Sequence, residues 1–219
     1  MRRVTRELVH DLKEMGIHLW MIPLVALAFI VMTYIVQAGL DAAGKQNIIT
    51  LPMLEALIPS LGGYGALMLM QGLLDTEGGE LVFTYPRTRL YWGLIRQFRF
   101  FILYAFLIAA VCICVTSIMR IDFAPTFYLT LAQSFAVMAV SFLGITAANR
   151  VSIGLVALVA FVGIQIMIGR EFEILNWIYT VSGGIGGPSV KSNAMLIFNA
   201  IIIGIFGWGL GQVWLRPPR

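Results

Sequence analysis

The sequence predicts an all-α membrane protein with six transmembrane helices, and three observations support this class. First, 59% of the 219 residues are hydrophobic and only 12% are charged. Soluble domains carry about 25% charged residues, so this chain has too few charges to cover a surface in water. Second, the apolar residues gather in runs about as long as a membrane-spanning helix. Third, Lys and Arg are shared unequally among the segments between these runs.

Six apolar runs are long enough to span a membrane, since a helix needs about 20 apolar residues to cross a hydrocarbon core of about 30 Å. Only Asn149 and Arg150 separate the fourth run from the fifth. We predict a tight turn there, because an unbroken helix would place an arginine inside the membrane. The predicted spans are residues 19–40, 56–74, 100–119, 127–148, 151–169 and 194–215.

The basic residues predict the orientation of these spans. With a cytoplasmic N-terminus, eleven of the 15 Lys and Arg residues lie in cytoplasmic segments and four lie outside. Cytoplasmic segments of membrane proteins carry an excess of Lys and Arg, so we predict a multi-pass protein of the cell membrane with both termini in the cytoplasm. The net charge of +4 then reflects orientation, and no nucleic-acid partner is predicted.

The segment before the first span has its own pattern. Apolar residues recur at helical spacing in residues 1–18, with most basic residues elsewhere around the helix. Such a helix lies in the headgroup layer with its apolar side towards the lipid, so we predict an amphipathic elbow helix followed by one six-span domain, residues 19–219. A solvated tail is the alternative. The apolar positions are Val4, Leu8, Leu12 and Met15.

The predicted spans contain no Asp, Glu, Lys, His or Arg near their midpoints. Glu55, Asp122 and Glu171 all fall at span ends. Proton-coupled carriers usually need a titratable group inside the membrane, so that class is disfavoured. Buried amides more often hold helices together than bind a substrate, and both interpretations stay open. Gly207 and Gly211 form a Gly-x-x-x-Gly pair, which permits close helix packing. The amides are Gln37, Gln71, Gln133, Gln165 and Asn199.

Motifs for catalysis, metal binding and nucleotide binding are missing from the sequence. It contains no His-Glu-x-x-His zinc motif and no Gly-x-Ser-x-Gly nucleophile motif. The glycine-rich run at residues 183–192 has Val190 before Lys191, where a phosphate-binding loop has glycine, so we predict a turn-rich outer loop at residues 170–193. The two cysteines stand two residues apart, on different faces of a helix. We therefore predict no enzyme activity and no cofactor for the chain alone.

The loop at residues 75–99 interrupts this apolar sequence with many charges. Its acidic residues come first, apolar residues follow, and Pro86 precedes the first arginines. Acidic side chains stabilise the start of a helix, and the residue before a proline is driven out of helical geometry. We predict a short amphipathic helix that ends near Thr84 or Tyr85 on the cytoplasmic side. The alternative is a plain connector whose arginines bind lipid phosphates.

One stretch of this loop resembles a known family. Glu77-Gly78-Gly79-Glu80-Leu81, followed by Tyr85-Pro86-Arg87-Thr88-Arg89, is similar to the motif after the second span of type 2 ABC-transporter permeases. In that family a glutamate and a leucine precede a Pro-x-x-Arg element. Here Glu80 precedes Pro86 by six residues, and Arg89 completes Pro-x-x-Arg. The usual Gly-Thr at the head of the motif is replaced by Glu77-Gly78-Gly79.

The resemblance implies that the loop is a coupling helix that docks on a separate ATPase subunit. The chain would be the permease of an ATP-driven exporter, paired with a second copy or a paralogue within membrane lipids, and ATP and magnesium would bind to the partner. Two rival functions remain, a channel or a carrier not driven by protons, and a lipid-modifying membrane enzyme. The predicted contact residues are Glu77, Glu80, Leu81, Phe83, Tyr85, Pro86, Arg87 and Arg89.

Overall fold

The part of the chain that the structure describes is helical throughout, which confirms the all-α class. This computed structural model describes residues 13, 15–40, 50–74, 90–167 and 193–215. η1 is a short π-helix that runs directly into α5, so the described residues form six long helices. The elements are α2 (His18–Leu40), α3 (Thr50–Leu74), η1 (Tyr91–Ile95), α5 (Arg96–Met119), α6 (Phe123–Ala148), α7 (Val151–Met167) and α8 (Asn193–Trp214).

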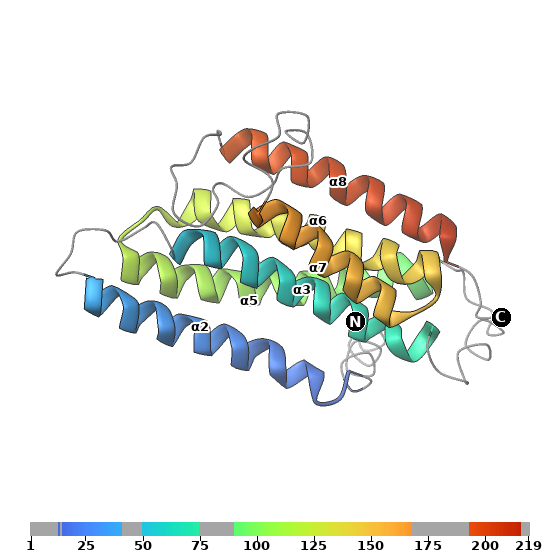
Figure 1. Ribbon diagram of the computed structural model, residues 1–219, viewed down its shortest axis with the longest axis horizontal. Helices are drawn as coiled ribbons and strands as arrows, with labels where there is room; N and C mark the ends of the chain where they lie inside the picture. Colours follow the sequence, from blue (N-terminus) through green and yellow to red (C-terminus); the bar gives the residue numbers. More distant parts are fainter. Residues whose placement is uncertain (1–12, 14, 41–49, 75–89, 168–192, 216–219) are drawn as a thin grey trace, which may run out of the picture.

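The six long helices lie side by side along the long axis and alternate in direction (Figure 1). α6 is central and packs against α3, α5, α7 and α8, whereas α2 lies at one side against α3 and α5. We call the end at which α3 ends and η1 begins the loop end, because residues 75–89 connect the two helices there. α2 begins and α8 ends at this same end. We call the other end of the bundle the opposite end.

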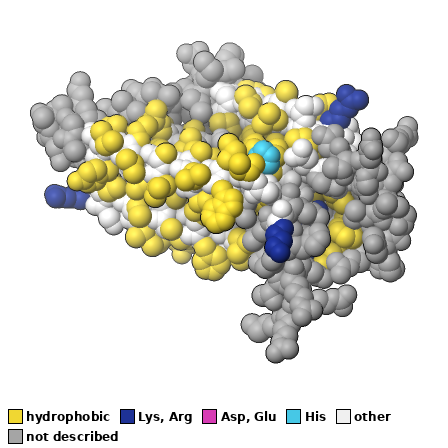
Figure 2. Space-filling view, turned by 90° about the horizontal axis from the view of Figure 1, so that it is seen from below, with side chains coloured by type: hydrophobic (Ala, Val, Ile, Leu, Met, Phe, Trp, Pro, Cys, Tyr) yellow, Lys and Arg dark blue, Asp and Glu magenta, His cyan; other side chains and the backbone are white. Residues whose placement is uncertain are grey.

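Helix lengths and surface composition fit a membrane protein. α2 and α7 contain the shorter apolar stretches Trp20–Val36 and Val151–Gln165. Figure 2 shows the face that carries α2 covered by hydrophobic side chains, with Lys and Arg side chains towards its ends. Water does not favour such a surface, whereas lipid does. The stretches long and apolar enough to cross a membrane are Leu51–Gln71, Tyr91–Met119, Phe123–Ala148 and Ala194–Trp214.

Three helices begin at least four residues earlier than the predicted spans, and α6 is one of them, at Phe123 in place of residue 127. In η1 and α5, residues 91–99, which were predicted as part of the 75–99 loop, are already helical. The reason is packing, because Arg96 and Gln97 are buried among the helices and Gln97 Nε2 donates a 2.9 Å hydrogen bond to the carbonyl oxygen of Ala66. Likewise α3 begins six residues before residue 56, at Thr50. Glu55 therefore lies inside a helix and not at its end.

The turn expected between the fourth and fifth spans is present. Only Asn149 and Arg150 separate α6 from α7. Asn149 adopts the left-handed conformation, with φ 52° and ψ 35°, which asparagine tolerates better than most residues. The helices then approach closely, since a Cβ atom on Gly144 would lie 3.1 Å from the Cα atom of Gly154. This tight hairpin confirms the division of the long apolar run into two helices.

The chain bends just before α2. Gly16 has a φ of +55°, and its amide donates a 3.1 Å hydrogen bond to the carbonyl oxygen of Lys13. Met15 beside it is buried in the core. Most of that predicted helix lies outside the described residues, as do nearly all of the predicted outer loop and residues 75–89 of the predicted coupling loop.

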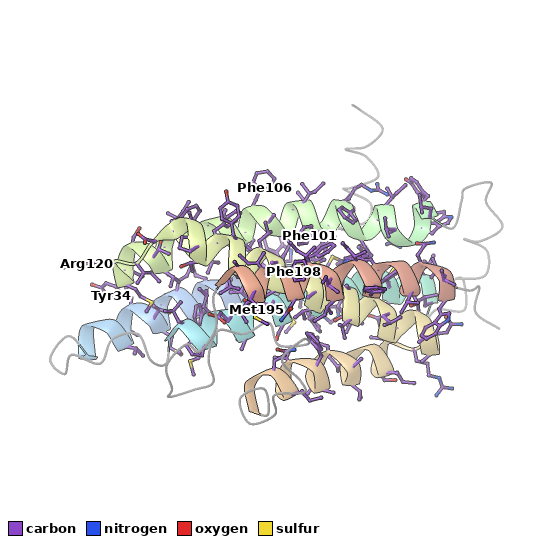
Figure 3. All side chains as sticks on the ribbon, turned by 90° about the horizontal axis from the view of Figure 1, so that it is seen from above. Tyr34, Phe101, Phe106, Arg120, Met195 and Phe198 are labelled. Atoms are coloured by element: carbon purple, nitrogen blue, oxygen red, sulfur yellow. The ribbon has the colours of Figure 1, made fainter. Side chains whose placement is uncertain are left out.

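Aromatic side chains fill the space between α5, α6 and α8. Phe101 points into the bundle (Figure 3), and its ring centroid lies 5.5 Å from that of Phe135. Trp208 of α8 stacks on Phe135 at 5.9 Å and contacts Phe142 at 5.4 Å. Phe106, five residues after Phe101, points away from the bundle. The helix α5 therefore has one face for the core and one for the surrounding medium.

Candidate functional site

The predicted ATPase-contact surface lies entirely outside the described residues, so this assignment stays a prediction. All eight of its members fall within residues 75–89, between the end of α3 and the start of η1. The structure does describe the helices that carry both ends of this segment. The residues concerned are Glu77, Glu80, Leu81, Phe83, Tyr85, Pro86, Arg87 and Arg89.

Two side-chain hydrogen bonds tie the helices at the loop end to the rest of the bundle. The Leu94 amide in η1 donates a 3.0 Å bond to Gln212 Oε1 of α8. Gly93 makes this contact possible, because a Cβ atom there would collide with the Gln212 amide. The Gln97–Ala66 bond connects α5 with α3 in the same way. The helices on either side of the 75–89 segment are thus bonded to each other and to α8.

Basic and aromatic side chains are combined where the 75–89 segment ends. The Arg99 guanidinium lies 5.1 Å from the centroid of the Tyr91 ring, within the range of a cation–π contact. Tyr91 also packs edge to face against Trp92, and Arg96 is only 4% exposed. Tyr, Trp and Arg with this placement are typical of the boundary between hydrocarbon and water. The loop end therefore has the chemistry of a membrane surface.

A second polar feature lies near the opposite end, inside the bundle. Glu55 of α3 is only 3% exposed, and its Oε2 accepts a 3.1 Å hydrogen bond from Gln133 Nε2 of α6. Glu55 stands five residues after the start of α3, a rise of about 8 Å. Thr130 and Ser134 beside Gln133 are also buried, and their hydroxyls donate to backbone carbonyls of their own helix. A glutamate side chain thus lies inside the apolar bundle, next to polar side chains of α6.

The register between α3 and α7 brings a third helix to this level. Gly63 of α3 lies against Leu158 of α7, and the two helices run in opposite directions. Gln165 comes seven residues after Leu158, and Ala56 comes seven residues before Gly63. Gln165 is therefore level with Ala56 and with its neighbour Glu55. Gln165 is buried, so its amide lies inside the bundle.

The register between α6 and α8 adds a fourth helix. Gly204 of α8 contacts Phe135 of α6, and these helices run in the same direction. Asn199 precedes Gly204 by five residues, as Thr130 precedes Phe135, so both are level. Gln71, in contrast, is exposed, and the side chain of Gln37 is outside the described part. We call the buried set at this level the polar layer: Glu55, Thr130, Gln133, Ser134, Gln165 and Asn199.

An apolar groove lies on another face of α3 and shares no residue with the polar layer. It encloses about 500 Å³ between α2, α3 and α7 and is open on one side. Its one polar lining residue is Ser60, whose hydroxyl donates a 2.6 Å bond to the carbonyl oxygen of Ala56. Glu55 does not line the groove, because at about 100° per residue it points to the side of α3 opposite Met53, Ala56 and Leu57. The lining residues are Val25, Ala28, Phe29, Met32, Met53, Ala56, Leu57, Ser60 and Val162.

The remaining chemically active side chains form no shared centre in the part of the chain that is described. Cys112 is buried and Cys114 is exposed, so they face different sides of α5 as predicted. His18 Nδ1 and Tyr64 Oη share a 2.6 Å hydrogen bond that links α2 with α3. Within the described ranges, no three His, Cys, Asp or Glu residues gather as metal ligands would.

Comparison of the chain with protein-family models, with curated proteins and with solved structures gives no match. Function is therefore inferred from the loop motif in the sequence and from the geometry of the helices. The relevant features of the structure are the hydrogen-bonded loop end and the polar layer.

Proposed function

We propose that the chain is the membrane-spanning permease subunit of an ATP-driven ABC transporter that works as an exporter. A separate ATPase subunit would supply ATP hydrolysis with magnesium, and a second permease copy or paralogue would complete the membrane unit. The observation that carries this proposal is the loop motif from Glu77 to Arg89 with its resemblance to the type 2 permease family.

The helix packing around the loop supports this function. A coupling element must pass movement to several helices at once, because one freely moving helix would not reshape a transport path. The Gln97–Ala66 and Leu94–Gln212 bonds join α3, α5, η1 and α8 at the loop end. A push on the loop from an ATPase would therefore reach helices that extend to the polar layer.

The proposal includes the six-span topology and the orientation of the chain. Four helices have the length and composition of spans, and α2 and α7 would complete the set as shorter apolar helices. The excess of Lys and Arg on one side places the loop end and both termini in the cytoplasm. In this orientation the polar layer lies in the outer half of the cell membrane.

Co-purification with an ATPase subunit tests the proposed function. The tagged full chain is isolated from its native membrane in a mild detergent, and its partners are identified by mass spectrometry. We expect a soluble subunit with a phosphate-binding loop, ATP hydrolysis by the complex and none by the chain alone. Isolation of the chain without any ATPase, together with substrate flux in liposomes that lack ATP, would overturn the proposal.

A carrier that works without an ATPase is the second candidate, and the burial of Glu55 favours it. From the sequence this residue was expected at a span end, whereas in the structure its carboxyl group lies inside the bundle. Ionisable groups in such positions often belong to ion or substrate pathways. The liposome measurement separates the two candidates, because only the carrier moves substrate without ATP.

A further inference from the structure

The apolar groove between α2, α3 and α7 is elongated and follows the direction of the helices. On α2 its lining extends from Val25 to Met32, and on α3 it extends from Met53 to Ser60. In each helix the four lining residues have the spacing i, i+3, i+4 and i+7, which places them on one face over a length of about 10 Å. The groove therefore has the shape of a channel that runs parallel to the two helices.

This channel occupies only the half of the bundle next to the opposite end. The apolar stretch of α3 that could cross a membrane extends from Leu51 to Gln71. The lining residues Met53 and Ser60 stand two and nine residues after Leu51, or about 3 and 14 Å along the helix. One leaflet contributes about 15 Å to a hydrocarbon core of about 30 Å. The groove therefore has the depth of a single leaflet.

Close helix contacts end the groove towards the loop end. Gly63 and Gly65 follow Ser60 by three and five residues on α3. A Cβ atom on Gly63 would lie 2.7 Å from Leu158 Cδ1 of α7, and one on Gly65 would lie 2.9 Å from Ile22 Cδ1 of α2. These two glycines let α7 and α2 approach α3 at this level, whereas nearer the opposite end the same three helices enclose the groove.

We propose that the groove binds one acyl chain of a phospholipid from the leaflet at the opposite end, and that this lipid joins α2 to α3 and α7. The side chains of α2 next to the groove are apolar and exposed, namely Leu24, Leu27 and Val31. Such a surface belongs in hydrocarbon, so an acyl chain enters the open side of the groove without leaving its own medium. This lipid site goes beyond the proposed function and does not depend on an ATPase.

The lining matches an alkyl chain in its chemistry. Eight of the nine lining residues are apolar, and the hydroxyl of Ser60, the ninth, already donates to the carbonyl oxygen of Ala56. An alkyl chain therefore leaves no lining side chain without a hydrogen bond. The headgroup of the lipid lies beyond the groove, at the end of the bundle where Tyr34 and Arg120 are exposed (Figure 3). Aromatic and basic side chains are typical of the headgroup layer.

Other occupants match the groove less well. A membrane-spanning helix of a second copy would follow α3 through both halves of the membrane, whereas the groove ends about half way, before Gly63. A polar or charged small molecule would lose its hydration and find no unbonded polar side chain in the lining. An acyl chain needs only apolar contact, and it reaches from the membrane surface to the middle of the membrane.

Native mass spectrometry of the full chain tests this proposal. The chain is reconstituted with phosphatidylcholine, released into a mild detergent and washed in that detergent. We expect the wild type to retain one phospholipid per chain. Ala28→Trp fills the groove and should lose the lipid, whereas Leu27→Trp places the same side chain on the exposed face of α2, outside the lining, and should keep it. A wild type without retained lipid, or an Ala28→Trp variant that keeps it, contradicts the proposal.

A photoreactive lipid gives a second test, which needs no variant. The wild type is placed in nanodiscs with phosphatidylcholine that carries a diazirine in one acyl chain, and the crosslinked residues are mapped by mass spectrometry. Crosslinks should be concentrated on the lining of α2 and α3, above the level at Ile205 and Phe206, which are exposed on α8 outside the groove. Equal labelling at both places would show bulk lipid only. An unlabelled groove in a dimeric sample would assign the groove to a second copy, and either result refutes the lipid site.

Discussion

Gly207 of α8 lies directly against the backbone of Ala139 of α6. A Cβ atom on Gly207 would come within 2.9 Å of Ala139 Cβ and within 3.1 Å of the Ala139 carbonyl carbon. Gly209, on the same helix, has open space at the corresponding position. Gly211 repeats the close contact one turn later, against Phe142. The Gly-x-x-x-Gly pair therefore serves the packing of α6 on α8, as its spacing predicted.

The first prediction compares Gly207→Leu with Gly209→Leu. The Gly207 variant should lose about 1–3 kcal/mol of stability, because overpacking forces α6 and α8 apart. Gly209→Leu should cost nothing, since its side chain enters open space and leucine favours a helix more than glycine does. Thermal unfolding of the purified protein in detergent measures both. Equal melting temperatures for the two variants would contradict the close approach of these helices.

The second prediction concerns the backbone at the end of α5. Arg120 adopts the left-handed conformation, with φ 54° and ψ 43°, and stands at the opposite end of the bundle (Figure 3). This geometry costs a residue with a Cβ atom about 1–2 kcal/mol, and glycine avoids the cost. Arg120→Gly should therefore raise the melting temperature. Arg120→Ala removes the same charge but keeps Cβ, so a gain of equal size with alanine would show that the charge, and not the backbone, is responsible.

Much of the fold follows from the sequence because lipid imposes simple rules. Within the described residues, each of the six apolar runs forms a helix over most of its length, and the turn at Asn149 and Arg150 lies where the length of the fourth and fifth runs required it. The early starts of α3 and α5 could not be predicted from hydropathy. They depend on tertiary contacts, such as the burial of Arg96 and Gln97 against neighbouring helices. A hydropathy profile counts these two residues as polar and therefore assigns them to a loop.

Only some members of the polar layer could be recognised from the sequence. Gln133, Gln165 and Asn199 stand out as amides in apolar runs, and a role in holding helices together agrees with their burial. That they share one level with Glu55 depends on the register between helices. Close contacts at Gly63 and Gly204 set this register. A sequence pattern within one helix does not contain that information, because it describes each helix separately.

The third prediction concerns the ties at the loop end. Gln97→Leu removes the hydrogen bond to the Ala66 carbonyl, and Gln212→Ala removes the acceptor for the Leu94 amide. Each should lower stability by about 1 kcal/mol. In the ATPase complex, each should also reduce the stimulation of ATP hydrolysis by substrate. Ser117→Ala is the control, since its exposed hydroxyl bonds only within α5. Normal stimulation of ATP hydrolysis by substrate in both glutamine variants would show that these two hydrogen bonds take no part in coupling.

The fourth prediction concerns orientation. Single cysteines are placed at Gly44, Ser189 and Thr88 in a chain whose Cys112 and Cys114 have been replaced by alanine. The first two should react with an impermeant thiol reagent in intact cells, because the distribution of Lys and Arg places them outside. Thr88→Cys should react only after the cells are opened. Labelling of Thr88→Cys in intact cells would reverse the proposed orientation.

The last prediction concerns the loop itself. Apolar anchors at the centre of a protein interface often cost about 2 kcal/mol or more when they are truncated, whereas charges at its rim cost less. Phe83→Ala and Leu81→Ala should therefore weaken ATPase binding strongly. Glu80→Lys should weaken it more than Glu80→Ala, because a lysine there adds repulsion or leaves a positive charge of the partner unpaired.

Co-purification of the ATPase with each loop variant measures this effect, and thermal unfolding of the variant alone shows whether the bundle is intact. Asp122→Ala serves as the control, because this exposed carboxylate lies at the opposite end of the bundle. The melting temperature should stay unchanged in all variants, since none of them replaces a buried residue of the described helices. Normal ATPase binding and transport in Phe83→Ala, Leu81→Ala and Glu80→Lys would show that the loop is a plain connector. The coupling function would then lose its main support, because the resemblance to the permease family rests on these same positions.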